Sequence, residues 1–396
     1  MRRTTLAAFA ALAGGVAPGA ANGVFELPAV VVEASRFGRS KAEMASHVDV
    51  LTRADVESSG ASSTAALLER RANVHFRSSG TPALAQVSMR GGGANGFGRV
   101  KILVDGEDLN NPDMAAQDLM RVPVRSVERV EVLHGPQTVL YGSDASAGVV
   151  NVVSDADDYE RKTTLEAHAG NLGAAGGHAG TRGGSEPDGA TYWASADYDR
   201  SDGWRDNAQS EFWSAKGGVK QRFGNGSWAA LKAFYSNSSY GLPGGLYADS
   251  GGGGWKKRAR SADDRSSHAR NDVYGFSVSA NGVVDDENAV EGSLSFRNRN
   301  SRSYGNLEYD VYGFAASLKA SNDARRFGLE NRFDAGVDLK DDLLFGDSSQ
   351  PGSAGGENDY NRFSAALFAR DELAITDTLS LIAGARFEGI NNRWAH

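Results

Sequence analysis

The chain has 396 residues, a formal net charge of −8 and no cysteine. The net acidity argues against general nucleic-acid binding, which requires a basic surface, and the lack of cysteine excludes disulfides and thiolate metal sites. The 49 glycines exceed the average usage of about 7% and indicate many turns and closely approaching backbones.

The first residues have the pattern of a secretory signal peptide. Arg2-Arg3 gives a positive start, residues 6–16 form a short apolar run, and Gly19-Ala20-Ala21 offers small residues for cleavage. We expect residues 1–21 to be a signal peptide; the alternative is a core helix that starts near the N-terminus. The sequence after this segment has no run of about 18 apolar residues, so it predicts no transmembrane helix. A soluble exported protein or a transmembrane β-barrel remains.

Residues 22–40 form a short leader after the predicted signal peptide. Ala29 to Val32 have high β-propensity, and Pro28 before them favours an extended backbone. We expect a free strand that awaits the edge of a partner; the alternative is an ordinary first strand of the next domain.

Residues 41–154 have the pattern of a small mixed α/β domain. Thr52 and Asp55 have the spacing of a capping box, which begins a short helix, and Ser63 precedes a second helix in TAALLERR. Short strands are predicted in NVHF, AQVSMR, RVKILVDG, VERVEVL and GVVNVVS. The last of these is apolar on both faces, which predicts a strand buried on both sides.

From about residue 160 onward, apolar and polar residues alternate over about ten residues at a time. In NRFDAGVDLKD, for example, Phe333, Val337 and Leu339 share one face. We count about eleven such segments, and this pattern is typical of transmembrane barrel strands. A soluble β-sandwich or propeller also alternates, but the charged polar face and the mixture of tight turns with long loops favour a barrel.

No motif in the sequence predicts catalysis or metal binding. The glycines of residues 91–96 match G-x-G-x-x-G, but a strand rather than a helix follows them. The seven histidines are scattered without helical metal spacing, and no nucleophile-elbow motif is present. The acidic residues of 155–158 lack an EF-hand pattern and indicate a solvated linker. We therefore predict no enzyme, no metal site and no cofactor.

Residues 48–154 resemble the plug domain of TonB-dependent outer-membrane receptors. The matching pieces come in the family's order and are VDVLTRADVESSGASSTAALLERRANV, VSMRGGG, VKILVDGEDLNNPDM and, most diagnostic, VERVEVLHGPQTVLYGSDASAGVVNVVS. ELPAVVVEASR at 26–36 resembles a TonB box, and the alternating segments stand where the family has barrel strands. One departure is His134, which stands where the family usually has arginine before Gly-Pro.

The resemblance implies a mainly β fold, with a small α/β plug followed by antiparallel strands of a transmembrane β-barrel. The implied domains are 1–21 signal peptide, 22–40 TonB box and linker, 41–154 plug, and 155–396 the N-terminal part of the barrel. Large plugged transporters have 22 strands, about twice the number predicted here. An open half-barrel would leave unpaired backbone groups in lipid, so we expect the chain to be an incomplete piece of a longer protein; the alternative is a short barrel that still closes.

The resemblance further implies active uptake of a scarce ligand across the outer membrane of a Gram-negative-type envelope. The ligand would be a metal chelate, either siderophore–iron or cobalamin, and LNNPDM with the compact plug is similar to the cobalamin branch. The implied partners are periplasmic TonB and outer-membrane lipid, with no nucleic acid. The rival interpretation is a passive β-barrel or exported β-domain without energy coupling.

Site residues are likewise implied by the resemblance, in three groups. TonB would add to the box as a paired strand through main-chain hydrogen bonds, at Glu26, Leu27, Pro28, Ala29, Val30, Val31, Val32, Glu33 and Ala34. Ligand contacts would come from outward plug loops, at Ser78, Ser79, Gly80, Thr81, Asn95, Phe97, Asn111 and Asp113. Charge pairs between plug and barrel wall would involve Arg90, Glu128 and Glu131, against the alternative of ordinary surface ion pairs worth about 0–1 kcal/mol.

Overall fold

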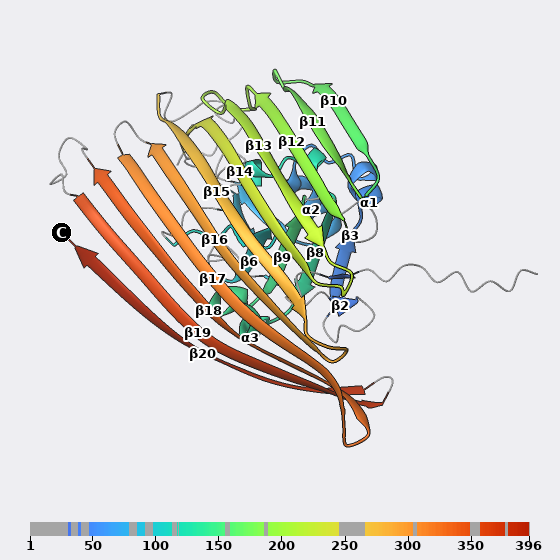
Figure 1. The fold of residues 1–396 in the computed structure, drawn as a ribbon. Helices are drawn as coiled ribbons and strands as arrows, with labels where there is room; N and C mark the ends of the chain where they lie inside the picture. The colour runs from blue at the N-terminus through green and yellow to red at the C-terminus, as the bar shows by residue number, and fades with distance from the viewer. Residues whose placement is uncertain are drawn as a thin grey trace, which may run out of the picture.

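The computed structural model (Figure 1) describes thirteen stretches of the chain. They are residues 31–32, 39–40, 47–78, 85–91, 98–112, 117, 119–154, 159–185, 189–244, 266–303, 307–348, 357–376 and 379–395. Within these stretches, no α-helix has the length and apolar character needed to cross a membrane. The predicted signal peptide, residues 1–21, lies outside them.

A small five-stranded sheet forms the centre of the N-terminal domain. Its strands, in spatial order, are β3 (Val48–Leu51), β8 (Arg129–His134), β9 (Gly148–Val153), β6 (Val100–Val104) and β7 (Glu107–Asp108). The pairing of β6 with β9 is parallel and the others are antiparallel. Two further pairs lie outside this sheet: β1 (Val31–Val32) with β2 (Arg39–Ser40), and β4 (His75–Ser78) with β5 (Ala85–Ser88).

Short helices complete this domain. They are α1 (Arg53–Ser58), α2 (Thr64–Arg71) and α3 (Thr138–Tyr141), with 3-10 turns η5 (Leu119–Arg121), η6 (Val124–Ser126) and η7 (Ser143–Ala145). The capping box predicted for α1 is confirmed: Thr52 N–H donates to Asp55 Oδ2 at 2.9 Å, and Asp55 N–H donates to Thr52 Oγ1 at 3.3 Å. Ser63 caps α2 through one hydrogen bond alone, in which Ala66 N–H donates to Ser63 Oγ at 3.2 Å. These side chains satisfy amide groups that the first helical turn leaves free.

The small domain has its own apolar core. All six residues of β9 are buried, which confirms the prediction of a strand covered on both faces. Leu67 and Leu68 of α2 have zero exposure and belong to the same buried cluster as Val130 and Val150 of the sheet. Burying such a side chain stabilises a fold by about 1.5–3 kcal/mol, so the domain is held together by burial without any disulfide.

The rest of the chain forms one antiparallel sheet in which each strand pairs with the next along the chain. Its eleven strands are β10 (Lys162–Ala169), β11 (Ala175–Gly184), β12 (Ala190–Ser201), β13 (Ser210–Arg222), β14 (Trp228–Gly241), β15 (His268–Val283), β16 (Asn288–Ser303), β17 (Leu307–Arg326), β18 (Leu329–Ser348), β19 (Glu357–Thr376) and β20 (Leu379–Ala395). Figure 1 shows the sheet curving around the small domain, with the longest strands toward the C-terminus. The predicted number of segments and their alternation are confirmed.

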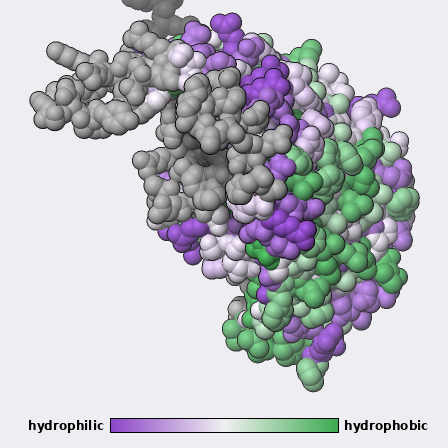
Figure 2. Space-filling model, turned by 90° about the vertical axis from the view of Figure 1, so that its left-hand side faces the viewer, coloured by the Kyte–Doolittle hydropathy of each residue, from purple (hydrophilic) through white to green (hydrophobic). Residues whose placement is uncertain are grey.

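The two faces of the long sheet differ in polarity. On the outer face, Leu294, Leu318 and Leu367 are 57–62% exposed, and Figure 2 shows hydrophobic side chains gathered over a broad band of the surface. On the inner face, Asp334 and Asp342 are buried. A sheet of a soluble protein has the reverse distribution, with apolar side chains enclosed and charged side chains exposed. The distribution seen here suits lipid on the outer face and a polar lumen on the inner face.

Candidate functional site

The interface between the small domain and the concave face of the long sheet is the candidate functional site. It is rich in charged and hydroxyl groups that come from both sides. Strand β7 meets the middle of the long sheet, the region around η6 meets its first strands, and α3 meets its last strands. A polar contact surface of this kind suits a part that sits inside a hydrated lumen.

Asp108 of β7 is the centre of the first group of contacts. Its Oδ2 accepts from Lys101 Nζ at 2.7 Å within the domain and from Lys340 Nζ of β18 at 3.2 Å. The Arg297 guanidinium of β16 donates to the backbone oxygen of Asp108 at 2.6 Å. Burial alone would raise the pKa of Asp108, but the ammonium groups of Lys101 and Lys340 outweigh it and hold the pKa well below its usual range. Asp108 therefore stays ionised and joins the small domain to the long sheet, which is called the wall below.

Glu107 lies next to Asp108, and its pKa is shifted in the opposite direction. Burial raises its pKa, and a hydrogen bond with Ser277 and the charges of Arg121 and Arg297 only partly offset this. Glu107 and Arg121 also line a cavity between β7 and the long sheet, together with Trp193, Phe234 and Tyr235. Two neighbouring carboxyl groups thus hold opposite protonation preferences at one contact with the wall.

A second group of contacts ties the region around η6 to the first strands of the long sheet. Glu166 of β10 pairs with Arg125 at 3.3 Å and with Arg53 at 3.6 Å. Glu128 Oε1 accepts from Arg182 of β11 at 3.0 Å. All these side chains are 19–35% exposed, so each pair is partly hydrated and individually weaker than a dry ion pair.

Helix α3 makes the third contact, with the last two strands. A Cβ placed at Gly142 would lie 2.9 Å from Glu388 Oε2, and the φ of Gly142 is +77°. The positive φ favours glycine, because other residues rarely adopt this backbone, and a Cβ here would also displace the carboxylate at the flexible end of Glu388. A Cβ placed at Gly384 of β20 would lie 3.1 Å from Val139 Cγ1 of α3. The helix therefore packs closely against the last two strands of the long sheet.

The charge pairs expected from the sequence lie in three different places. Glu128 meets Arg182 of the long sheet. Glu131 is buried within the small sheet, where it accepts from Arg129 at 2.8 Å and from Asn151 at 3.2 Å. Arg90 is an exposed turn residue with φ +50° whose guanidinium lies beside Gly135.

Sequence reasoning missed the contacts of Asp108 with the wall. Its cationic partners Lys340 and Arg297 are far away along the chain. The only local signal was a carboxyl pair, Glu107-Asp108, directly after the Asp105-Gly106 turn.

Few of the expected ligand and TonB contacts fall within the described residues. Ser78 pairs with Ala85 at the end of β4, and Asn111 follows the buried Asn110. Val31 and Val32 form β1 and pair with Ser40 and Arg39. Outside the described residues lie Glu26, Leu27, Pro28, Ala29, Val30, Glu33 and Ala34 of the TonB box, and the ligand candidates Ser79, Gly80, Thr81, Asn95, Phe97 and Asp113.

Comparisons with known proteins agree with this architecture. Residues 40–149 match the TonB-dependent Receptor Plug Domain family. A vitamin B12 transporter, BtuB of Vibrio cholerae, is 33% identical over 144 residues, which cover 36% of this chain and 23% of the relative. The chain thus matches less than a quarter of the length of this curated relative.

Solved structures extend the likeness to the long sheet. The ferric-catecholate import receptor Fiu of E. coli K12 superposes with a TM-score of 0.73 at 14% identity, covering 91% of this chain and 62% of that chain. The pyoverdine receptor FpvA of Pseudomonas aeruginosa PAO1 gives 0.74 at 13% identity, covering 92% and 60%. At such identities the likeness concerns the fold alone. The chain thus comprises a TonB-dependent receptor plug domain, over residues 40–149, followed by an antiparallel sheet with the fold of the strands in these solved receptors.

Proposed function

We propose that the protein is an energy-coupled importer that recruits TonB through residues 26–34 and takes up a scarce metal chelate. In this proposal residues 1–21 direct export, 22–40 carry the TonB box and linker, 41–154 form the plug, and 155–396 contribute to the wall. The observation that carries the proposal is a plug whose dry core is its own and whose contacts with the wall are charged.

This division of forces suits a plug that must move without unfolding completely. Breaking the apolar core of the plug would cost about 25 cal/mol of free energy for each Å² of apolar surface exposed to water. Breaking a partly hydrated pair such as Glu128–Arg182 lets both groups return to water at small cost. A pull on the N-terminal segment would therefore release the plug from the wall before its core opens.

The vitamin B12 transporter relatives favour cobalamin as the first ligand to test. The solved structures with a similar fold include receptors named for ferric siderophores, and these make a ferric siderophore the second candidate. A passive barrel without energy coupling is the rival function.

Deletion of residues 26–34 separates coupling from binding. We expect uptake of cyanocobalamin or of a ferric siderophore by whole cells to fall to the level of cells without TonB, because the added strand has no partner left. Binding of the same probe to the purified protein should stay within about twofold, since the deleted residues lie outside the plug and the wall.

The control is a variant that keeps the main chain and changes side chains, Val31→Thr, which should retain uptake because strand addition makes little demand on side chains. Uptake that persists after the deletion would instead support the passive barrel. Absence of binding for every chelate tried would contradict the proposed ligand class.

A further inference from the structure

Strand pairing brings two histidines and a carboxylate together at one end of the plug sheet. In the register of β3 with β8, Val48 lies opposite Leu133, so His47 lies opposite His134. The backbone confirms this neighbourhood, because His134 N–H donates to the oxygen of His47 at 3.0 Å. Asp49 is two residues after His47 and therefore on the same face of the strand.

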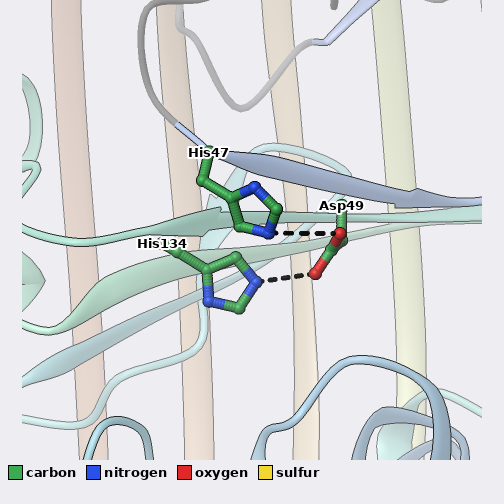
Figure 3. Close-up of side chains that lie close together, drawn as sticks. All are labelled: His47, Asp49 and His134. Carbon is green, nitrogen blue, oxygen red and sulfur yellow. Dashed lines mark hydrogen bonds and ion pairs between the residues drawn. The ribbon is translucent and has the colours of Figure 1, made fainter.

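The three side chains form a compact cluster (Figure 3). His134 Nε2 lies 2.8 Å from Asp49 Oδ2, and His47 Nε2 lies 3.5 Å from Asp49 Oδ1. The two imidazole rings are 5.0 Å apart. One ligand atom from each residue can be chosen so that all lie within 4.8 Å of one another. The side chain of His134 is 11% exposed, that of Asp49 33% and that of His47 71%, so the cluster has a fixed base and an open side.

These distances are close to those of a metal site. Tetrahedral zinc has nitrogen and oxygen ligands at about 2.0–2.2 Å, which places neighbouring ligand atoms about 3.3–3.6 Å apart by geometry. Small side-chain rotations would bring the cluster to this spacing. Two imidazoles with one carboxylate suit zinc, copper or nickel, whereas calcium and magnesium prefer oxygen ligands alone.

We propose that His47, Asp49 and His134 bind a divalent transition-metal ion, with Zn²⁺ as the reference ion and a fourth position open to solvent. The ion would join the first residues of β3, an edge strand of the plug sheet, to the end of β8. It would fasten the plug sheet next to the point where the chain enters β3 from the N-terminal segment. The site would be built by strand register and not by a sequence motif.

Other histidines of the chain provide matched controls. His178 pairs with Asp197 at 2.8 Å, and His168 pairs with Asp199 at 2.9 Å, both within the barrel wall. Among the described residues, only the cluster at 47, 49 and 134 brings three ligand groups together. His75 of β4 is an exposed histidine of the plug itself.

The test is titration of the untagged, metal-stripped protein in detergent with Co²⁺, followed through its visible absorption, and competition with Zn²⁺. We expect one site per chain, and at least tenfold weaker binding in His134→Gln and in His47→Gln. His75→Gln and His178→Gln should bind as the wild type does. The experiment measures metal binding alone, so its result does not depend on whether the protein takes up a chelate.

Two results would overturn the proposal. One is a site whose affinity is unchanged in both His134→Gln and His47→Gln, and the other is the absence of saturable binding in the wild type. Thermal unfolding in EDTA checks that the variants fold. His47→Gln carries the test if His134→Gln unfolds early, because the largely exposed side chain of His47 can be lost without disturbing the plug.

Discussion

Asp108→Asn is expected to loosen β7 from the barrel wall by about 1.5 kcal/mol, the low end of the range for a hydrogen bond to a charged group. The side chains of Asp108, Lys101 and Lys340 are 21%, 12% and 30% exposed, so the two ammonium groups are left partly hydrated beside a neutral amide. About 1.5 kcal/mol corresponds to roughly tenfold faster local opening at 1.4 kcal/mol per factor of ten. Hydrogen exchange of the amides of β6 and β7 measures this opening directly.

The effect of Asp108→Asn should depend on pH in a defined direction. The pKa of Asp108 is depressed in the folded protein, so its contribution is fully present above the unfolded value of 3.8 and is lost as the pH falls toward the folded value. We therefore expect wild type and variant to differ throughout the neutral range and to converge only in strong acid.

The neighbouring Glu107→Gln is the matched control, with the opposite expectation. The pKa of Glu107 is raised by burial, so ionising it disfavours the folded state as the pH rises above the unfolded value of 4.5. A neutral amide removes this cost, and exchange at neutral pH should be unchanged or slower. If both variants opened equally fast, the role assigned to Asp108 would be wrong.

A disulfide between α3 and β20 should hold the plug against the wall. The chain has no cysteine of its own, and Val139 Cγ1 lies 3.1 Å from the position of a Cβ at Gly384. Sulfur in place of that methyl group would bring the pair Val139→Cys and Gly384→Cys close to disulfide geometry, in which the Cβ atoms are about 3.5–4.5 Å apart.

We expect the free energy of unfolding of the oxidised double variant, measured in urea, to rise by up to about 5 kcal/mol, which is the entropic limit for a long loop. Uptake of the chelate should stop on oxidation and return with reductant. Val139→Cys with Gly389→Cys is the control, because a Cβ at Gly389 has no neighbour within 4 Å. Failure of the first pair to cross-link would contradict the packing of α3 on β20, and full uptake while cross-linked would contradict a moving plug.

Local sequence rules predicted the elements of this fold well. The Thr52–Asp55 capping box is formed as its spacing indicates, because a cap depends only on residues three apart. The barrel strands follow from alternation, since side chains of period two must lie on opposite faces. Even the glycine-rich Ala175–Gly184, in which few side chains can show alternation, forms a strand, β11.

The partners of charged residues could not be predicted in the same way. Glu128 and Glu131 are three residues apart in sequence, yet one meets Arg182 of the wall and the other is buried beside Asn151. Their roles depend on how the plug is docked, which no local pattern encodes. The position of His134 is similar, because its neighbour His47 is supplied by the register of β3 against β8.

Energy coupling through TonB is the central claim, and cysteine cross-linking tests it without any knowledge of the ligand. Single cysteines at Ala29, Val31 and Glu33 give a clean readout in a chain without native cysteine, and Asp286→Cys, in an exposed short turn of the wall, is the control. In cells whose TonB carries one cysteine in its binding region, we predict disulfide-linked complexes from the three box positions and none from Asp286. Equal cross-linking from Asp286, or none from the box, would contradict the account.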